Sequence, residues 1–291
     1  MRKLIFGLRP ADTITIIFLI FLSTIVIFNY QNIPEAHFLL TTYIGLVIIQ
    51  IIILRFKNIG NIIGIFHDLI FPTMCIMIIF DSLGELVHYI NPKDIDQTLI
   101  KLDYIIFNGY PTVILEKIMN PLLTDIMQLA YTTYYFIPVS FGVILLLNKQ
   151  RDEFNKTLFL VLFCFYLSFL GYILMPAVGP RFTIDHLQNI DLQGLFIAEQ
   201  IQNILNALEG IKRDAFPSGH TAIPLVILYS AYKFKRIFFW LSLPVVAALI
   251  FSTVYCRYHY VVDVIAGFAL AVMTIVSGDK YYKWWLSKRE S

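Results

Sequence analysis

Short polar segments divide the chain into eight apolar stretches. A helix that crosses a bilayer needs about 20 mostly apolar residues. Charged residues make up 14% of the chain, against about 25% in an ordinary soluble domain, so a soluble globular fold is excluded. We therefore predict an all-α polytopic membrane helical bundle with spans near residues 12–28, 37–54, 62–80, 126–147, 157–176, 219–233, 237–256 and 259–277.

Three segments need a separate argument. The first stretch, Ala11 to Phe28, has the length of a signal peptide, but no small-residue cleavage site follows it, so we expect a retained membrane helix. The sixth, from Gly219 to Tyr232, is short and begins with polar residues, and its assignment depends on the motif that it carries. Between the third and fourth stretches, we expect residues Tyr104 to Met119 to form a helix that lies in the membrane interface.

The basic residues of the loops predict the orientation. Eight spans place both termini on one side, and basic residues gather in cytoplasmic loops. Most of the 22 lysines and arginines fall on the side of the termini, so we predict that both termini are cytoplasmic and that the other side faces the periplasm, a lumen or the exterior. The basic residues on that other side are Lys93, Lys101, Lys117, Arg181, Lys212, Arg213 and Arg257.

Several classes of ligand are not expected. The net charge is only +2 and no continuous basic stripe is present, which argues against nucleic acid as a partner. Cys75, Cys164 and Cys256 have no metal-ligand spacing, and no carboxylate cluster suggests Mg²⁺ or Ca²⁺. We therefore expect no metal and no cofactor.

His259 and Asp263 are four positions apart at the start of the last stretch. If the span begins near Arg257, both side chains lie on one helix face, and the carboxylate can hold one nitrogen of the imidazole. The other nitrogen is then available as a nucleophile. The alternative is a histidine at a helix end with a capping aspartate.

Ser218, Gly219 and His220 stand at the start of the sixth stretch. Ser218 can cap a helix, Gly219 allows close approach of a ligand to the backbone, and the free amides of a helix N-terminus attract an anion. A histidine there can donate a proton to a leaving oxygen. The alternative is a helix start with a solvated histidine.

Arg181 follows the fifth stretch on the same predicted side of the membrane as both histidines. A guanidinium stays charged and offers several donors to phosphate oxygens, so Arg181 and Arg257 are candidate phosphate-binding residues. A basic residue in the tight turn at Arg257 runs against the topology rule, which favours an anion-binding role there. For Arg181 the alternative is an interfacial arginine.

Together these motifs resemble the type 2 phosphatidic acid phosphatase (PAP2) superfamily. Pro217-Ser218-Gly219-His220 resembles its second motif, Ser252 with His259 and Asp263 resembles its third, and Arg181 stands at the place of the first-motif arginine. Within the superfamily, Gly179-Pro180-Arg181, the segment Arg257 to Asp263 and the stretch Tyr131 to Pro138 are similar to the branch that contains inositol phosphorylceramide synthase.

The resemblance covers roughly residues 64 to 277. It implies a six-helix catalytic core over 61–278, preceded by two extra N-terminal transmembrane helices within 1–60 and followed by a basic cytoplasmic tail at 279–291. It also implies a metal-independent reaction through a phosphohistidine at His259, with His220 protonating the leaving group and Asp263 supporting His259.

The chain departs from the family pattern at three positions. The first-motif lysine is replaced by Leu174, the proline after its arginine by Phe182, and the third-motif arginine after the serine by Thr253. Arg257 could replace the last of these if it lies before the helix. Lys212 or Arg213 could supply the positive charge of the missing lysine.

The expected function is that of a phosphatase or phosphotransferase that acts on a lipid phosphate or phospholipid at the non-cytoplasmic leaflet of the bilayer. Hydrolysis and transfer to an alcohol such as inositol share the first chemical step, and the sequence leaves both open. A non-catalytic transporter or scaffold is a further alternative, because ionisable residues in membrane segments also mark substrate pathways.

Overall fold

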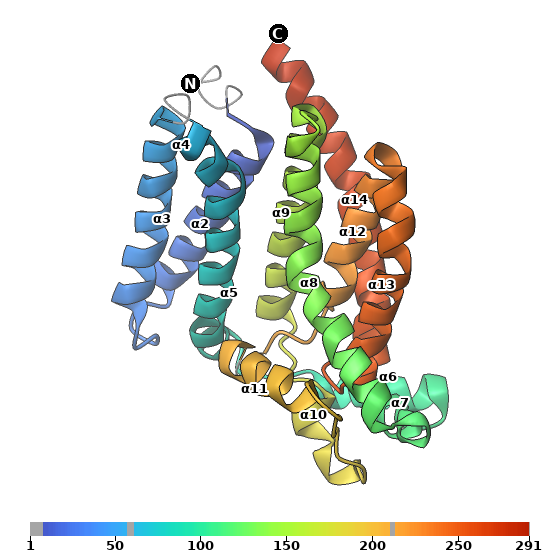
Figure 1. Ribbon diagram of the computed structural model, residues 1–291. Coiled ribbons are helices and arrows are strands. Elements are labelled where there is room, and N and C mark those ends of the chain that lie inside the picture. Colours follow the sequence, from blue (N-terminus) through green and yellow to red (C-terminus); the bar gives the residue numbers. More distant parts are fainter. Residues whose placement is uncertain (1–7, 57–60, 210–212, 291) are drawn as a thin grey trace.

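A computed structural model describes residues 8–56, 61–209 and 213–290, which form helices and connecting loops without a strand. The helices stand side by side in one bundle (Figure 1). Its long helices are α2 (Pro10–Phe28), α3 (Ala36–Phe56), α5 (Phe71–Ile90), α8 (Pro121–Leu147), α9 (Arg151–Leu174), α12 (Gly219–Phe234), α13 (Arg236–Tyr255) and α14 (Val261–Glu290).

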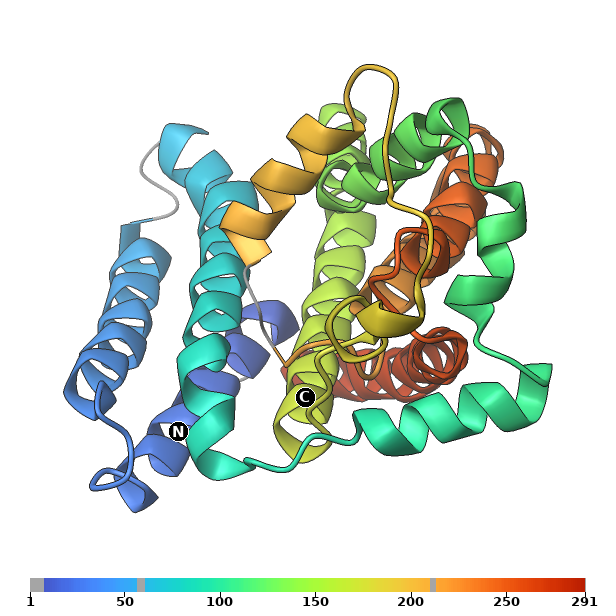
Figure 2. The same cartoon turned by 90° about the horizontal axis from the view of Figure 1, so that it is seen from below.

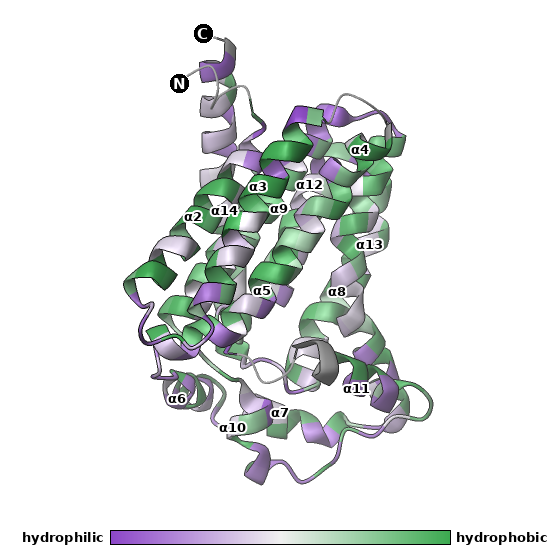
Figure 3. Cartoon of the chain, turned by 90° about the vertical axis from the view of Figure 1, so that its left-hand side faces the viewer, coloured by the Kyte–Doolittle hydropathy of each residue, from purple (hydrophilic) through white to green (hydrophobic). Residues whose placement is uncertain are grey.

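Among the described residues, seven helical stretches are long and apolar enough to cross a membrane. The third of them begins in α4 (Asn61–Ile65) and continues through a π-helical turn, η1 (Phe66–Ile70), into α5. Hydrophobic residues cover most of the long helices, and hydrophilic residues gather towards the ends of the bundle (Figure 3). The predicted all-α polytopic membrane bundle is confirmed.

The sixth predicted span, α12, has only 16 residues and is not one of the seven. It packs against α8, α9, α13 and α14 and therefore lies at the centre of the bundle. Two glycines allow close packing around its first turn. A Cβ on Gly267 of α14 would lie 2.6 Å from the Ser218 carbonyl oxygen, and one on Gly171 of α9 would lie 2.2 Å from Cδ of Pro217.

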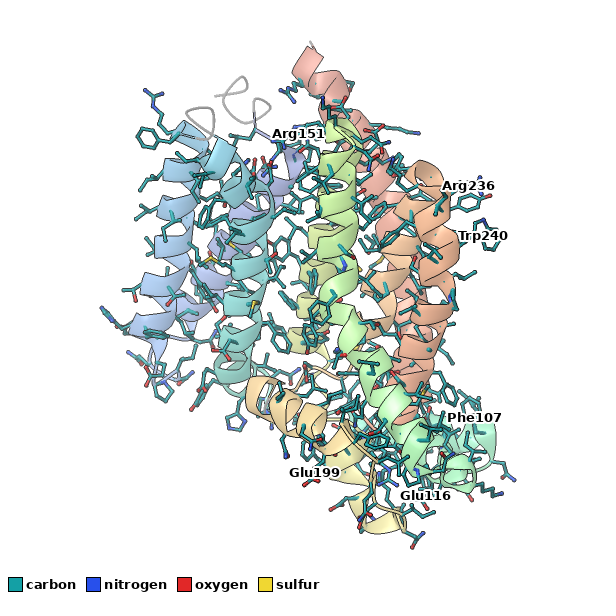
Figure 4. All side chains as sticks on the ribbon, viewed as in Figure 1. Phe107, Glu116, Arg151, Glu199, Arg236 and Trp240 are labelled. Atoms are coloured by element: carbon teal, nitrogen blue, oxygen red, sulfur yellow. The ribbon has the colours of Figure 1, made fainter. Side chains whose placement is uncertain are left out.

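The two ends of the bundle differ in structure. The start of α2 and the end of α14 lie at one end, where Figure 4 also places Arg151 and Arg236. Short helices cover the opposite end, where Figure 4 places Phe107, Glu116 and Glu199; seen from that end, α6 and α7 run along one side of the bundle and α11 along another (Figure 2). The short elements are α6 (Asp96–Phe107), α7 (Pro111–Ile114), η2 (Leu115–Ile118), α10 (Pro180–Thr183), η3 (Asp185–Leu187) and α11 (Ala198–Glu209).

The prediction of one interfacial helix from Tyr104 to Met119 is wrong. The segment forms the end of α6, then α7 and η2, because the chain turns between Phe107 and Pro111. Asn108 adopts a left-handed conformation with φ 50°, which ends α6, and Pro111 begins the next helix.

Candidate active site

His220 and His259 come together at the end of the bundle that the short helices cover. His220 is the second residue of α12, and His259 lies in the turn between α13 and α14. The Nε2 atom of His259 lies 3.5 Å from Nδ1 of His220. The His259 side chain is buried and that of His220 is partly buried.

His259 and Asp263 do not share a helix, contrary to the expectation that the span begins near Arg257. The last helix begins at Val261, because Arg257 has φ 65° and the chain turns there. The contact between the two side chains nevertheless forms, at 3.4 Å from Nδ1 of His259 to Oδ2 of Asp263. The same Oδ2 accepts a hydrogen bond from the backbone N–H of Tyr260 at 2.8 Å, which holds the turn against the first turn of α14.

His259 makes a shorter contact with a backbone carbonyl than with the Asp263 carboxylate. Nδ1 of His259 lies 2.8 Å from the carbonyl oxygen of Ala215. Because a carbonyl only accepts, Nδ1 is the donor, and in a neutral imidazole the lone pair is then on Nε2, towards His220. Ala215 was not predicted, since a backbone group leaves no side-chain pattern in a sequence.

The start of α12 is built as the sequence predicts. The Oγ atom of Ser218 accepts a hydrogen bond from the Thr221 backbone N–H at 3.3 Å and thereby caps the helix. The backbone N–H of Ser218 donates to the carbonyl oxygen of Asp263 at 3.1 Å. A Cβ on Gly219 would lie 2.8 Å from the hydroxyl oxygen of Tyr172. The second and third motifs are thus joined directly through their backbones.

Arg181 lies in α10, and a series of aromatic rings lies between its guanidinium and His220. Its guanidinium lies 5.3 Å from the ring centroid of Phe182 and 5.6 Å from that of Tyr258. Tyr258 stacks on Tyr131, and Tyr131 stacks on His220, with centroids 4.2 Å and 4.4 Å apart. The stretch Tyr131 to Pro138 stood out by its resemblance, but these contacts were not predicted, because aromatic residues are too frequent in a membrane bundle for their partners to be inferred from the sequence.

Arg257 takes part in a buried ion pair. Its Nη2 atom donates to Oε1 of Glu116 at 2.9 Å and to the carbonyl oxygen of Ile190 at 2.5 Å. Burial lowers the pKa of the Arg257 guanidinium, and the nearby Glu116 carboxylate opposes that effect. In the structure the Nη2 atom of Arg257 binds Glu116 and the Ile190 carbonyl oxygen. The phosphate-binding role of Arg257 stays a prediction.

The predicted phosphate-binding residue Lys212 lies outside the described residues. Its neighbour Arg213 donates from Nε to Oδ1 of Asp94 at 2.9 Å. Among the residues for which side chains are described, no group of three or more His, Cys, Asp or Glu could hold a metal ion.

Carboxylates of α6 and α8 bind the backbone of the loops around the site. Asp96 accepts hydrogen bonds from the backbone N–H groups of Val178 and Gly179, each at 2.9 Å, and from the Tyr260 hydroxyl at 2.9 Å. These contacts fix the loop before Arg181, where Gly179 has φ 98° and a Cβ would lie 2.7 Å from the Tyr258 carbonyl oxygen. The sequence did not indicate this role for Asp96.

Two further aspartates bind backbone amides. Asp103 accepts from the N–H groups of Val261 and Val262, at 3.0 and 2.9 Å, and thereby caps the start of α14. Burial raises the pKa of the Asp103 carboxyl, although both hydrogen bonds act in the other direction. Asp125 accepts from the four backbone N–H groups of residues 195–198, at the start of α11.

Comparison with known proteins identifies the family. Residues 105–277, more than half of the chain, match the PAP2 superfamily. The chain belongs to the PAP2 superfamily. The matched region runs from α6 into α14 and contains both histidines, Asp263, Arg181 and the capped start of α12. Together with its seven apolar helical stretches, this makes the chain an integral multi-pass membrane protein.

Two curated relatives are similar to the chain. It is 27% identical over 187 residues to a PA-phosphatase related-family protein of Dictyostelium discoideum, an alignment that covers 57% of this chain and 34% of that protein. It is 28% identical over 156 residues to a phosphoinositol dihydroceramide synthase of Bacteroides thetaiotaomicron, covering 49% of this chain and 51% of that protein. The chain thus spans between about a third and a half of the length of these relatives. No solved structure matches it.

Proposed function

We propose that this protein is a membrane-embedded lipid phosphatase or phosphotransferase that works through a phosphohistidine at His259. The observation that carries the proposal is the orientation of the His259 ring. Its Nδ1 is held by the Ala215 carbonyl oxygen and the Asp263 carboxylate, and its Nε2 faces His220. An imidazole in this tautomer carries its lone pair on Nε2, as a nucleophile requires.

The proposed reaction has two steps. Nε2 of His259 attacks phosphorus, the bond from phosphorus to the leaving oxygen breaks, and His220 gives its proton to that oxygen. In the second step water or an acceptor hydroxyl attacks the phosphohistidine, His220 takes the proton, and His259 is released. Asp263 and the Ala215 carbonyl stabilise the His259 imidazolium that forms, as the acid of a catalytic triad does.

Positive groups near the pair would bind the phosphate oxygens. The Ser218 and Gly219 segment places the N-terminus of α12 beside the histidines, and Arg181 lies above the ring of Tyr258, which stacks on the ring next to His220. Arg257 and Lys212 complete the proposed phosphate-binding set. These groups would stabilise the charge that develops in the transition state.

The proposed substrate is a lipid phosphate or phosphodiester at the non-cytoplasmic leaflet. Support comes from the family and from the basic residues at the end of the bundle opposite to the histidines, including Arg151 and Arg236 (Figure 4). With them we propose that both termini are cytoplasmic. The catalytic core would comprise residues 61–278, with α2 and α3 within 1–60 as an addition and 279–291 as a basic cytoplasmic tail.

A transferase is the second candidate. The relative from Bacteroides thetaiotaomicron is named a phosphoinositol dihydroceramide synthase. If this chain shares that activity, the first step leaves the phosphate with its headgroup on His259, and in the second step the hydroxyl of inositol or of another alcohol, such as a ceramide, attacks that phosphate in place of water.

The test measures phosphate release by the purified wild type and His259→Ala from phosphatidic acid, phosphatidylglycerol phosphate and undecaprenyl diphosphate, with EDTA present. We expect EDTA-resistant release that falls at least about 10³-fold in His259→Ala, because the nucleophile is lost. His186→Ala, an exposed histidine on η3, serves as the control. Absence of release together with headgroup exchange onto a ceramide would establish the transferase, and activity retained in His259→Ala would refute the phosphohistidine.

A further inference from the structure

Two tyrosine rings of α8 enclose the imidazole of His220. The Tyr131 ring stacks on it with a centroid separation of 4.4 Å and an interplanar angle of 22°. The Tyr134 ring lies 4.0 Å away at 36°. The two tyrosines are three residues apart, so they project from the same face of α8.

This pair is part of a longer column. The other side of Tyr131 stacks on Tyr258 at 4.2 Å and 27°, and the guanidinium of Arg181 lies 5.6 Å from the Tyr258 ring. Tyr131 is completely enclosed, with 1% of its surface exposed. The column therefore joins the proposed phosphate-binding arginine to the proposed acid through ring contacts, and a shift of either tyrosine would move His220.

The ring faces also affect the charge of His220. The face of an aromatic ring carries negative charge density, which attracts a cation above it. The tyrosine faces thus favour the imidazolium, the form that can donate a proton, against the effects of burial and of a charged His259. The other titratable groups near this part of the site are Tyr135, whose ring meets His220 edge-on at 6.5 Å, Tyr172 of α9, Asp214 in the loop before α12, and Asp263 behind His259.

We propose that Tyr131 and Tyr134 are positioning residues that hold His220 as the proton donor to the leaving group. The proposal rests on the function proposed above, since it requires His220 to act as an acid. It predicts that the effect of the tyrosines on the rate depends on the leaving group. An alkoxide leaves only with a proton, whereas p-nitrophenolate leaves without one, so the step that forms the phosphohistidine should depend on the tyrosine rings only for the lipid substrate.

The experiment compares Tyr134→Leu, Tyr134→Phe and Tyr131→Phe with the wild type on phosphatidic acid and on p-nitrophenyl phosphate. Phe136→Leu is the matched control, because Phe136 is on the same helix and 69% exposed. In Tyr134→Leu we expect kcat/KM for phosphatidic acid, which reports the step that forms the phosphohistidine, to fall by about 10²-fold, in the range of a general-acid contribution, with a much smaller change in kcat/KM for p-nitrophenyl phosphate. The alkaline limb of its pH profile for phosphatidic acid should move to lower pH. Both phenylalanine variants should stay close to the wild type.

Each other outcome has a clear meaning. An equal loss on both substrates in Tyr134→Leu, or a loss in Tyr134→Phe as large as in Tyr134→Leu, would overturn the proposal, since it would indicate a merely structural role or a role of the hydroxyl. Wild-type rates in Tyr134→Leu would overturn it as well and leave the proposed function intact. If the wild type releases phosphate from neither substrate, hydrolysis fails as the proposed function, whatever the role of the tyrosines.

Discussion

Two sets of aspartates, one at each end of the bundle, have different partners. At the site end, Asp96, Asp103 and Asp125 accept hydrogen bonds from backbone N–H groups of the loops and helix starts around the histidines. At the opposite end, Asp12 of α2 and Asp68 of η1 bind side chains. Their partners are Arg9 (2.8 Å to each carboxylate), His67 (3.1 Å to Asp12) and Arg151 (2.5 Å to Asp68).

The two kinds of partner have different consequences. An ion pair between side chains joins one helix to another, so the pairs of Asp12 and Asp68 tie the start of α2 to η1 and α9. A carboxylate that binds backbone amides fixes the path of a loop, and through Asp96 and Asp103 it fixes the segments that precede Arg181 and follow His259. Substitutions of Asp12 or Asp68 should therefore lower stability, and substitutions of the aspartates at the site end should lower activity.

The largest effect is expected for Asp12→Ala. The change leaves Arg9 and His67, both buried, without one of their partners. Loss of one member of a buried pair costs about 3–5 kcal/mol, which denaturant unfolding in detergent would measure. The specific activity of the folded protein should change little. Asp152→Ala, an exposed aspartate at the start of α9, is the control; an equal effect of both changes would contradict the importance of the buried pair.

Asp96→Ala should have its main effect on turnover. The loop before Arg181 loses the acceptor of the Val178 and Gly179 amides, and a displacement of about 1 Å in a site can lower the rate about 10²-fold. Phosphate release per folded enzyme is the measurement. Asp94→Ala, two residues before Asp96 but paired with Arg213, provides the comparison. Full activity in Asp96→Ala would show that the loop keeps its path without the carboxylate.

The smallest effect is expected for Asp103→Asn, since the amide oxygen can still accept from one of the two α14 N–H groups, with a loss of about 1 kcal/mol. Burial raises the pKa of the Asp103 carboxyl. The folded chain therefore holds this proton at a pH where the unfolded chain has released it, and the stability from Asp103 falls as pH rises through that window. The unfolding free energy should decline less steeply in the variant as pH rises from the ordinary pKa of an aspartate to the raised pKa of Asp103; parallel profiles would contradict this role.

The sequence indicated the groups that we propose to react, but not the residues that hold them in place. His220, His259 and Asp263 carry chemistry in their side chains and stand in short motifs, and the structure brings them together. A carboxylate such as Asp96 binds backbone amides about 80 residues away. Almost every residue has a backbone amide, so no sequence pattern shows which amides a carboxylate will bind.

The spans were predicted from hydropathy, but two local features were not. The spacing of His259 and Asp263 suits one helix face, yet it also suits a turn closed by the hydrogen bond from the Tyr260 N–H to Asp263, and the structure has the turn. The break in the interfacial segment depends on the left-handed Asn108 before Pro111, which hydropathy does not detect.

The short central helix has a consequence for the bilayer. The 16 residues of α12 extend about 24 Å, whereas the hydrocarbon core of a bilayer is about 30 Å thick. With the Phe234 end of α12 at one boundary, His220 lies several ångströms below the other. The lipid phosphate of the proposed reaction would therefore have to sink beneath its neighbours, or the bilayer would have to become thinner around this face of the protein. Membrane thickness would thereby enter the energetics of the proposed substrate binding, through hydrophobic mismatch.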